Sequence, residues 1–236
     1  AGLVTLAVPE PLHSALAGHL PEVTWISLPH ENGFITRAGA IPVSLNLGRA
    51  TAFLVGPGFG LADATRDFLA ALLEMDLPPL VVDADALKLL AQIPNWQKKL
   101  PAFTVLTPHP GEMCVLTGLS KEEIQSDREA LASKFAKKWG HVVVLKGAFT
   151  VIAAPDGRIA VIPVASAALA RAGTGDVLAG LIVGLCAQGV EAFEAALAGA
   201  WIHAQAGLAA LEGVGSTASV LAGDVLDYVN DVMAEL

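Results

Sequence analysis

The chain has 236 residues, of which 54% are hydrophobic and only 16% are charged, and its formal net charge is −9. An acidic chain without basic runs is a poor partner for a nucleic-acid backbone, so we expect no nucleic-acid binding. The length suits one large domain over residues 1–236, and the apolar composition suits an oligomer or an α/β fold with a sheet buried on both faces.

Cysteine and hydropathy patterns narrow the class of protein further. Cys114 and Cys186 have neither the paired framework of secreted proteins nor the spacing of metal ligands. No long apolar run is free of glycine, proline and charge, and the sequence opens without the basic stretch of a signal peptide. We therefore expect a cytoplasmic protein with reduced thiols that does not associate with membranes.

The first part of the chain alternates short apolar runs with helical runs. Apolar strands separated by helices predict a mostly parallel sheet that is covered on both faces. The predicted strands are residues 3–8, 23–28 and 51–56, residues 79–85 and 102–108 are each predicted as a strand that runs into a loop, and the predicted helices are residues 11–20 and 62–74.

The pattern changes from residue 142 onwards. Three β-rich runs follow one another with only short turns, and the Pro-Asp-Gly sequence at residues 155–157 suits a hairpin, so we expect an antiparallel edge on the sheet. Helical runs then continue to the end. The predicted strands are residues 142–147, 149–154 and 158–163, and the predicted helices are residues 175–188, 193–211 and 219–233.

Four loops that directly follow predicted strands are rich in glycine, proline, histidine or acidic residues. In open α/β sheets, ligands bind beyond the carboxyl ends of the strands. Any one of these loops could be only a turn, but their shared placement predicts a site. The loops are residues 56–60 (GPGFG), 83–85 (DAD), 107–112 (TPHPGE) and 146–150 (KGAFT).

A glycine-rich segment, residues 172–176 (AGTGD), opens a predicted helix. Gly173 and Gly175 allow a sharp turn with free N–H groups, and the helix N-terminus adds partial positive charge, so we predict an anion hole for a phosphate. Asp176 has two interpretations. It is either a helix-capping side chain, or a general base that accepts the proton of a hydroxyl attacking a phosphoryl group.

The other polar loop residues also have two interpretations each. Lys146 and Thr150 either contact a nucleotide or lie on a solvated hairpin turn. His109 is held between two prolines, which suits ligand contact, although a histidine there is often a plain surface residue. Glu112 is either an acid favoured at a helix N-terminus or a residue that orders water on Mg²⁺.

Two further pairs of residues are interpreted structurally. Asp83 and Asp85 could form a cation site, but we favour Asp85 as the cap of the next helix. Gly180 and Gly184 lie four apart in a predicted helix, where each costs about 1 kcal/mol relative to alanine, so we expect close packing against them. The histidines other than His109 show no convergent spacing and are interpreted as structural.

Taken in order, the motifs GPGFG, VVDADAL, LTPHPGE, LKGAFT and ARAGTGDVLAG resemble those of the NAD(P)H-hydrate dehydratases, a family of the ribokinase-like superfamily. The resemblance runs from about residue 3 to the end of the chain. It implies a ribokinase-like three-layer α/β sandwich: a mostly parallel central sheet, helices on both faces and an antiparallel edge.

The resemblance also implies a repair reaction on hydrated NADH or NADPH (NADHX, NADPHX), with ADP or ATP as co-substrate and Mg²⁺. The ring hydroxyl is phosphorylated, phosphate leaves and NAD(P)H is restored. Asp176 matches the family's base, and Glu112 its indirect metal contact. The hydrate-binding positions implied are Gly60, His109 and Asp176, and the nucleotide-binding positions are Lys146, Gly147, Ala148, Phe149, Thr150, Gly173, Thr174 and Gly175.

The resemblance carries one departure and two rival interpretations. Family members usually have a further strand, glycine-rich turn and helix before the equivalent of Ala1, so we expect the sheet to lack a strand or to receive it from elsewhere. Family members also commonly form tetramers.

The rival interpretations are a ribokinase-like kinase of a vitamin-precursor alcohol, such as hydroxyethylthiazole or hydroxymethylpyrimidine, and a nucleotide-binding fragment without catalysis. A Rossmann dehydrogenase is disfavoured because no GxGxxG follows the first strand.

Overall fold

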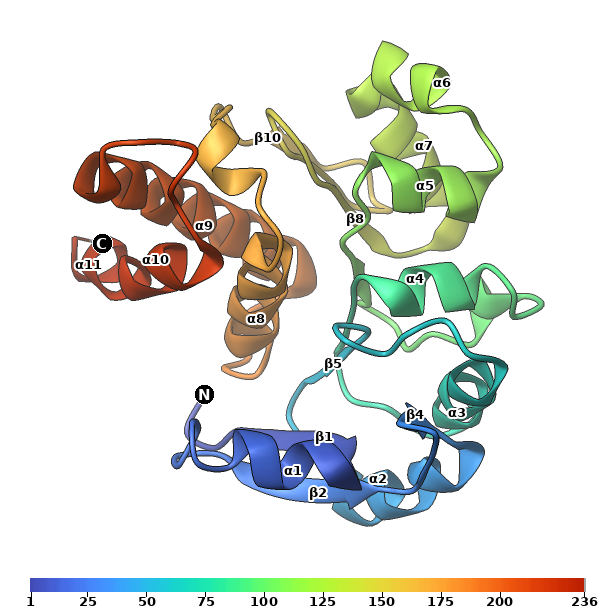
Figure 1. The fold of residues 1–236 in the computed structure, drawn as a ribbon. Coiled ribbons are helices and arrows are strands. Elements are labelled where there is room, and N and C mark those ends of the chain that lie inside the picture. Colours follow the sequence, from blue (N-terminus) through green and yellow to red (C-terminus); the bar gives the residue numbers. More distant parts are fainter. Residues whose placement is uncertain (236) are drawn as a thin grey trace.

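A computed structural model describes residues 1–235. Its main element is a six-stranded sheet in the order β10-β9-β8-β7-β6-β5, accompanied by two small sheets, β1-β2 and β3-β4 (Figure 1). The strands are β1 (Thr5–Pro9), β2 (Thr24–Leu28), β3 (His30–Glu31), β4 (Phe34–Ile35), β5 (Phe53–Val55), β6 (Leu80–Val82), β7 (Val105–Leu106), β8 (Val142–Leu145), β9 (Val151–Ala153) and β10 (Ile159–Val161).

Strands β5 to β8 run parallel, with Val55 opposite Val82 and Leu106 opposite Val143. Strand β9 is antiparallel to both β8 and β10, so the expected antiparallel edge is confirmed. The parallel strands therefore bring their carboxyl ends, and the loops that follow them, to one edge of the sheet.

Helices cover both faces of the six-stranded sheet (Figure 1). Helices α3, α4, α5 and α7 lie on one side, and α8 and α9 on the other. The helices are α1 (Glu10–Leu16), α2 (Ala40–Leu47), α3 (Asp63–Leu72), α4 (Asp85–Leu90), α5 (Pro110–Thr117), α6 (Lys121–Ser126), α7 (Arg128–Trp139), α8 (Thr174–Cys186), α9 (Ala192–Val214), α10 (Ala222–Asp227) and α11 (Val229–Ala234).

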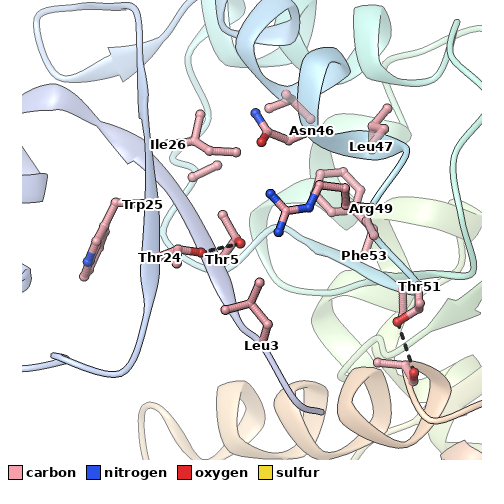
Figure 2. A pocket seen from close by; sticks show the side chains of 15 residues that line it. Leu3, Thr5, Thr24, Trp25, Ile26, Asn46, Leu47, Arg49, Thr51 and Phe53 are labelled. Atoms are coloured by element: carbon pink, nitrogen blue, oxygen red, sulfur yellow. Dashed lines mark hydrogen bonds between the residues drawn. The ribbon is translucent and has the colours of Figure 1, made fainter.

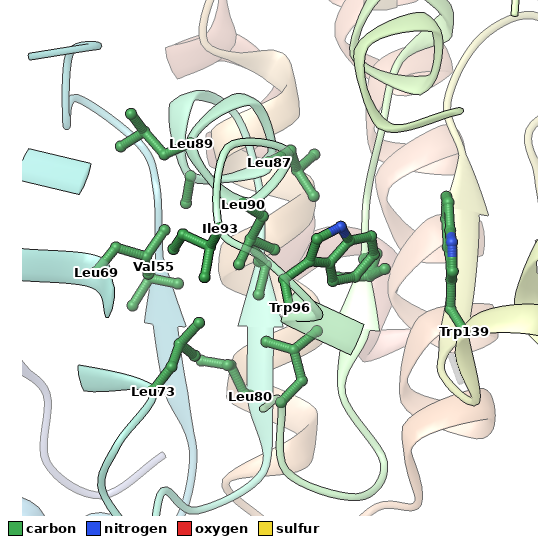
Figure 3. Close-up of a cluster of buried hydrophobic side chains, with 14 of the residues drawn as sticks. Val55, Leu69, Leu73, Leu80, Leu87, Leu89, Leu90, Ile93, Trp96 and Trp139 are labelled. Carbon is green, nitrogen blue, oxygen red and sulfur yellow. The ribbon is translucent and has the colours of Figure 1, made fainter. Parts of the chain in front are cut away.

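The strands form two cores because successive side chains point to opposite faces of the sheet. Val82 and Leu106 pack into one core with the helices α3, α4 and α7. Val81 and Val105, their neighbours along the chain, pack into a second core with α8 and α9. Figure 3 shows part of the first core, where side chains of β5 and β6 meet those of α3 and α4. The predicted three-layer α/β class is therefore confirmed.

The first two predicted strands do not join this sheet. Strands β1 and β2 pair with each other in parallel and form a sheet of their own, so the prediction of one continuous sheet is wrong for this pair. The physical reason is that, within residues 1–235, no strand pairs with the free edge of β1 or with the outer edge of β5.

The prediction of one continuous helix over residues 219–233 is wrong. The chain forms α10 and α11 instead, separated by Tyr228. Helix α10 begins only at Ala222 because Asp224 turns back and accepts a hydrogen bond of 2.7 Å from the backbone N–H of Leu221. No helix among the described residues is long and apolar enough to cross a membrane.

Candidate functional site

A buried ion-pair cluster lies where the loops after β6, β7 and β8 meet. Lys146 follows β8, and its Nζ lies 2.5 Å from Oδ1 of Asp83, which follows β6. The same Nζ lies 3.8 Å from Oε2 of Glu112, which comes from the first turn of α5, the helix that follows β7. Only 1% of the Asp83 side chain and 4% of the Glu112 side chain are exposed, so the sheet edge places one cation between two buried carboxylates.

Gly56, at the end of β5, allows this cluster to form. Its φ is 124°, and a side chain there would collide with the backbone carbonyl of Asp83. Glycine alone combines that backbone conformation with so close an approach. The second carboxylate oxygen of Asp83, Oδ2, is buried without a hydrogen-bond partner, which leaves an acceptor available at the floor of the site.

His109 and Glu112 form a reciprocal cap at the start of α5. The backbone N–H of His109 donates to Glu112 Oε2 at 2.8 Å, while Nδ1 of His109 accepts from the N–H groups of Gly111 and Glu112. Burial and the positive charge of Lys146 lower the pKa of His109, and this keeps Nδ1 free to accept. The opposite ring nitrogen, Nε2, lies 3.3 Å from Oε1 of Glu112, and half of the His109 side chain is exposed.

The carboxylate of Glu112 takes part in this cap through both of its oxygens. Its Oε2 accepts from the His109 backbone, and its Oε1 lies 3.3 Å from the His109 ring. Burial raises the pKa of Glu112 above its ordinary value, although Lys146 opposes that shift. Residues 1–235 contain no group of three or more side chains arranged to hold a metal ion. Both carboxylate oxygens of Glu112 already face His109.

The glycine loop after β5 is tied to α4. The N–H of Gly60 donates to Oδ2 of Asp85 at 3.0 Å, and Lys88 lies 3.0 Å from Oδ1 of the same residue. The interpretation of Asp85 as a helix cap is therefore wrong, because its carboxylate holds the Gly60 loop instead. Ala84 occupies the cap position with φ of 52°, a conformation that is costly for a residue with a β-carbon.

The start of α8 faces the Lys146 cluster. Gly173 caps the helix with φ of 86°, and Thr174 fastens the loop by donating from its hydroxyl to the carbonyls of Leu169 and Arg171. Gly175 lies against the cluster: a β-carbon there would sit 3.4 Å from Lys146 Nζ.

Asp176 is exposed and its side chain makes no hydrogen bond or ion pair with any described residue, so the capping interpretation finds no support. Partial burial, and then the negative charge of Asp83, raise the pKa of Asp176 above its ordinary value of 3.8, whereas Lys146 lowers it. Asp83 and Lys146 both affect the pKa of Asp176 because their charges lie close to it across the loop. An unpaired carboxylate with raised proton affinity, next to a cation, is suited to accept a proton.

A cavity of about 430 Å³ opens beside this loop. It lies between the turn after β8, the loop that precedes α8, and helix α9. Four of the predicted nucleotide positions in the Lys146 turn line it, together with Thr174 and Gly175. Phe149 and Gly173 do not: Phe149 is 54% exposed at the tip of the turn, with φ of 54°.

His203 also lines this cavity, and its interpretation as a plain structural residue missed that position. Burial lowers the pKa of His203 to about 4, and its Nε2 is buried without a partner. The ring is therefore neutral at physiological pH. A single histidine within an apolar helix gave no pattern from which the sequence could have placed it beside Thr174.

The family described as NAD(P)H-hydrate dehydratase matches residues 1–230 of this sequence. The chain belongs to this family. The motifs that carry the resemblance thus lie within a matched region that covers nearly the whole chain, rather than in isolated short segments.

Individual dehydratase relatives agree with that assignment. The bifunctional NAD(P)H-hydrate repair enzyme Nnr of Moorella thermoacetica is 41% identical over 237 residues, which cover 100% of this chain and 44% of that protein. The ADP-dependent (S)-NAD(P)H-hydrate dehydratase of Neisseria meningitidis is 43% identical over 178 residues, covering 74% of this chain and 60% of that protein. The chain thus spans less than two thirds of either relative.

A solved dehydratase structure shares the fold. The ADP/ATP-dependent NAD(P)H-hydrate dehydratase from Bacillus subtilis, co-crystallized with ATP/Mg²⁺ and soaked with CoA, superposes with a TM-score of 0.79 at 28% identity. The match covers 99% of this chain and 81% of that one. The layered α/β fold described above is therefore shared with a solved ribokinase-like dehydratase.

Proposed function

We propose that this chain catalyses the nucleotide-dependent dehydration of NADHX and NADPHX to NADH and NADPH, with ADP or ATP as phosphoryl donor. The observation that carries the proposal is the exposed carboxylate of Asp176. It has no partner among the described residues, and it stands at the mouth of a glycine turn that faces Lys146. The names of the relatives support the same chemistry.

The geometry suits phosphoryl transfer to a hydroxyl. Asp176 accepts the hydroxyl proton of the hydrated nicotinamide ring, and the ring oxygen attacks the terminal phosphorus of the nucleotide. The bond between that phosphorus and the leaving nucleotide breaks, while Lys146 and the N–H groups at the start of α8 stabilise the phosphate charge. The ring C–O bond then breaks, phosphate departs, the adjacent ring carbon loses a proton, and NAD(P)H results.

Each ligand has a place in this proposal. The nucleotide lies in the cavity beside the Lys146–Thr150 turn and the Gly173–Gly175 loop, and the hydrate lies towards Gly60 and His109. Mg²⁺ would neutralise phosphate charge. Asp83 Oδ2, the buried oxygen without a partner, suits it directly, and Glu112 suits it through water.

The proposal is tested by incubating the protein with enzymatically prepared NADHX, ADP and Mg²⁺ and following the absorbance of NADH. We expect Asp176→Asn to lower turnover by about 100-fold or more, because it removes the base, while nucleotide affinity measured by calorimetry stays unchanged. Asp63→Asn is the matched control, since Asp63 is also an exposed aspartate in the first turn of a helix. Unchanged turnover in Asp176→Asn would remove this residue from the mechanism.

The same assay separates the rival functions. Phosphorylation of a thiazole or pyrimidine alcohol without recovery of NADH would favour a vitamin-precursor kinase. Nucleotide binding without either turnover would favour a binding fragment. Asp176 argues against the second rival, because binding alone does not require a base.

We also propose that the protein is cytoplasmic and forms a homotetramer. The apolar composition supports association, and exposed apolar residues such as Ile41 and Leu45 on α2 offer surface for it. Light scattering coupled to size-exclusion chromatography gives the molar mass directly. A monomer at micromolar concentration would refute the tetramer.

A further inference from the structure

Two of the cavities differ in whether their polar side chains have partners. The first, of about 350 Å³, lies between β1 and β5 (Figure 2). There the hydroxyls of Thr5 and Thr24 lie 2.6 Å apart, and Thr51 donates to the carbonyl of Ala187. The second is the cavity of about 430 Å³ beside the start of α8. Within residues 1–235, only the second of these two is lined by a residue with a buried, unpartnered side-chain atom.

That residue is His203. It is 8% exposed, and its Nε2 is buried without a hydrogen-bond partner among the described residues. Native structures rarely keep a buried polar atom unpaired, so each instance calls for an explanation. Four other side-chain atoms share this state, and none of them belongs to a residue that lines the cavity: Thr65 Oγ1, Asp83 Oδ2, Arg128 Nε and His141 Nδ1.

The place of His203 on α9 directs its side chain to the cavity. Ala200, His203 and Ala204 all line the cavity, and their spacing of three and four residues puts them on one face of the helix. The imidazole is therefore the largest side chain that α9 contributes to the lining. The torsion about its Cβ–Cγ–ring bond has a broad, roughly two-fold profile, so the ring can turn a nitrogen towards a ligand without a strained rotamer.

The other polar side chains that line the cavity already have partners. Lys146 lies against Asp83, and the hydroxyl of Thr174 donates to carbonyls of its own loop. Thr150 donates to a carbonyl of its own turn at 2.9 Å, and Ser166 accepts from a backbone N–H two residues further on. A ligand in the cavity therefore meets one ring whose hydrogen-bonding capacity the described residues do not use.

Helix α8 lines the cavity only near its start, with Thr174, Gly175 and Leu178. Further along the helix, a β-carbon at Gly180 or at Gly184 would meet nothing within 4 Å, so the prediction that these glycines serve close packing is wrong for residues 1–235. The wall that α8 supplies is thus a glycine turn followed by one apolar side chain. It offers a ligand no polar side chain beyond Thr174.

His203 lies near the end of the cavity that we assign to the phosphates. Burial lowers the pKa of His203 to about 4; among its neighbours, the backbone of Thr174 raises that pKa and the charge of Lys146 lowers it. Both neighbours belong to the phosphate-binding turns of the proposed function. Apolar side chains such as Ile162 and Val164 line the rest of the cavity and suit a purine. Because the ribose joins the phosphates to the base, it is the part of the nucleotide that passes His203.

We propose that the imidazole of His203 hydrogen-bonds a ribose hydroxyl of the nucleotide and makes the site selective for ribonucleotides over deoxyribonucleotides. This inference rests on the nucleotide site of the proposed function. A hydroxyl both donates and accepts, so it satisfies a nitrogen of the neutral ring in either tautomer. A site built to bond a hydroxyl rejects the analogue that lacks it, because the buried partner is then left unpaired.

Nucleotides that lack one hydroxyl test this contact. The probes are ADP, 2′-deoxy-ADP and 3′-deoxy-ADP, each titrated into the protein with Mg²⁺ by calorimetry. We expect at least one deoxy analogue to bind the unaltered protein about tenfold or more weakly than ADP. Leucine fills the place of the ring without a hydrogen bond, so His203→Leu should bind ADP and that analogue equally. His203→Gln keeps a polar group at a similar reach and should recover part of the discrimination.

His141→Leu is the matched control. His141 is also a buried histidine with an unpartnered ring nitrogen, and burial lowers its pKa as well. Its Nε2 lies 2.8 Å from the carbonyl of Gln97, and it does not line this cavity. We expect His141→Leu to keep the full discrimination. Circular dichroism checks that each variant folds.

A measurement on the unaltered protein decides if His203→Leu does not fold. In nitrogen NMR, ADP should shift a ring-nitrogen resonance of His203, and saturation with the weaker analogue should not. Two results would overturn the inference and leave the proposed function intact: both deoxy analogues bind as tightly as ADP, or the discrimination persists in His203→Leu. Failure of ADP to bind at all would refute the proposed nucleotide site and this inference with it.

Discussion

The site has a buried floor and an exposed rim, and the two differ in what holds their residues. On the floor, Asp83 and Glu112 lie within 4 Å of Lys146 and are shielded from water. On the rim, Asp176 is exposed and pairs with no described residue, although Asp83 and Lys146 both act on its pKa. Asp83 and Asp176, two aspartates that each lie in a loop region of the sequence pattern, therefore have different surroundings in the folded protein.

This difference shows how burial determines what a charged residue of the site contributes to stability. A buried charge is stable only when paired, so changing the floor should cost folding free energy. An exposed carboxylate with raised pKa contributes little to stability, so changing the rim should cost activity alone. Four variants test that division.

Gly56→Ala should have the largest effect on the floor. The strained φ together with the collision against Asp83 should reduce the free energy of unfolding by about 4 kcal/mol or prevent folding. Gly58→Ala is the control, because Gly58 also has positive φ (72°) but nothing within 4 Å of an added β-carbon. Urea denaturation followed by circular dichroism measures both. Equal losses in the two variants would mean that backbone conformation alone, and not the contact with Asp83, matters.

Asp83→Ala should come next. It leaves Lys146 partly buried without its nearest counter-charge, and we expect a loss of about 3 kcal/mol in the free energy of unfolding. In the double variant Asp83→Ala/Lys146→Met, which removes both charges, much of that loss should be recovered. A double variant no more stable than Asp83→Ala would show that the ion pair is not what holds the floor.

His109→Ala should be milder, since it removes the cap of α5 at a cost of about 1 kcal/mol. Asparagine retains an acceptor, so His109→Asn should preserve stability. Because folding lowers the pKa of His109, its contribution is complete above about pH 6.5 and declines as the pH falls through the lower folded value. Urea titrations at several pH values measure this. If the variants lose more free energy of unfolding, relative to the unaltered protein, as the pH falls, the neutral imidazole of His109 is not what caps α5.

Asp176→Asn should have the smallest effect on stability and the opposite sign. Folding raises the pKa of Asp176, so the ionised form is slightly disfavoured in the folded protein above the ordinary pKa. We expect the melting temperature of Asp176→Asn to rise by about 1 °C at neutral pH, and this gain to disappear below about pH 4. A marked fall in melting temperature would place Asp176 among the structural residues of the floor.

The sequence by itself determined the class of the fold and the loops that form the candidate site. Alternating apolar runs and helical runs predicted the parallel strands, and the Pro-Asp-Gly turn predicted the antiparallel edge, because both signals are local. The loops GPGFG, DAD, TPHPGE and KGAFT were located for the same reason: each directly follows a strand. The order of these motifs identified the family.

Only the tertiary structure decided which of these residues touch. Asp83 and Lys146 are 63 positions apart, and no local pattern could pair them or turn Asp85 away from its own helix towards Gly60. Helix α7 and the shorter helices α2, α4, α5 and α6 went unassigned, because most span only two turns and rely on packing for stability. The separation of β1 and β2 from the large sheet likewise depends on whether a strand lies between them, since pairing is a contact between distant segments and is not a property of either strand's own sequence.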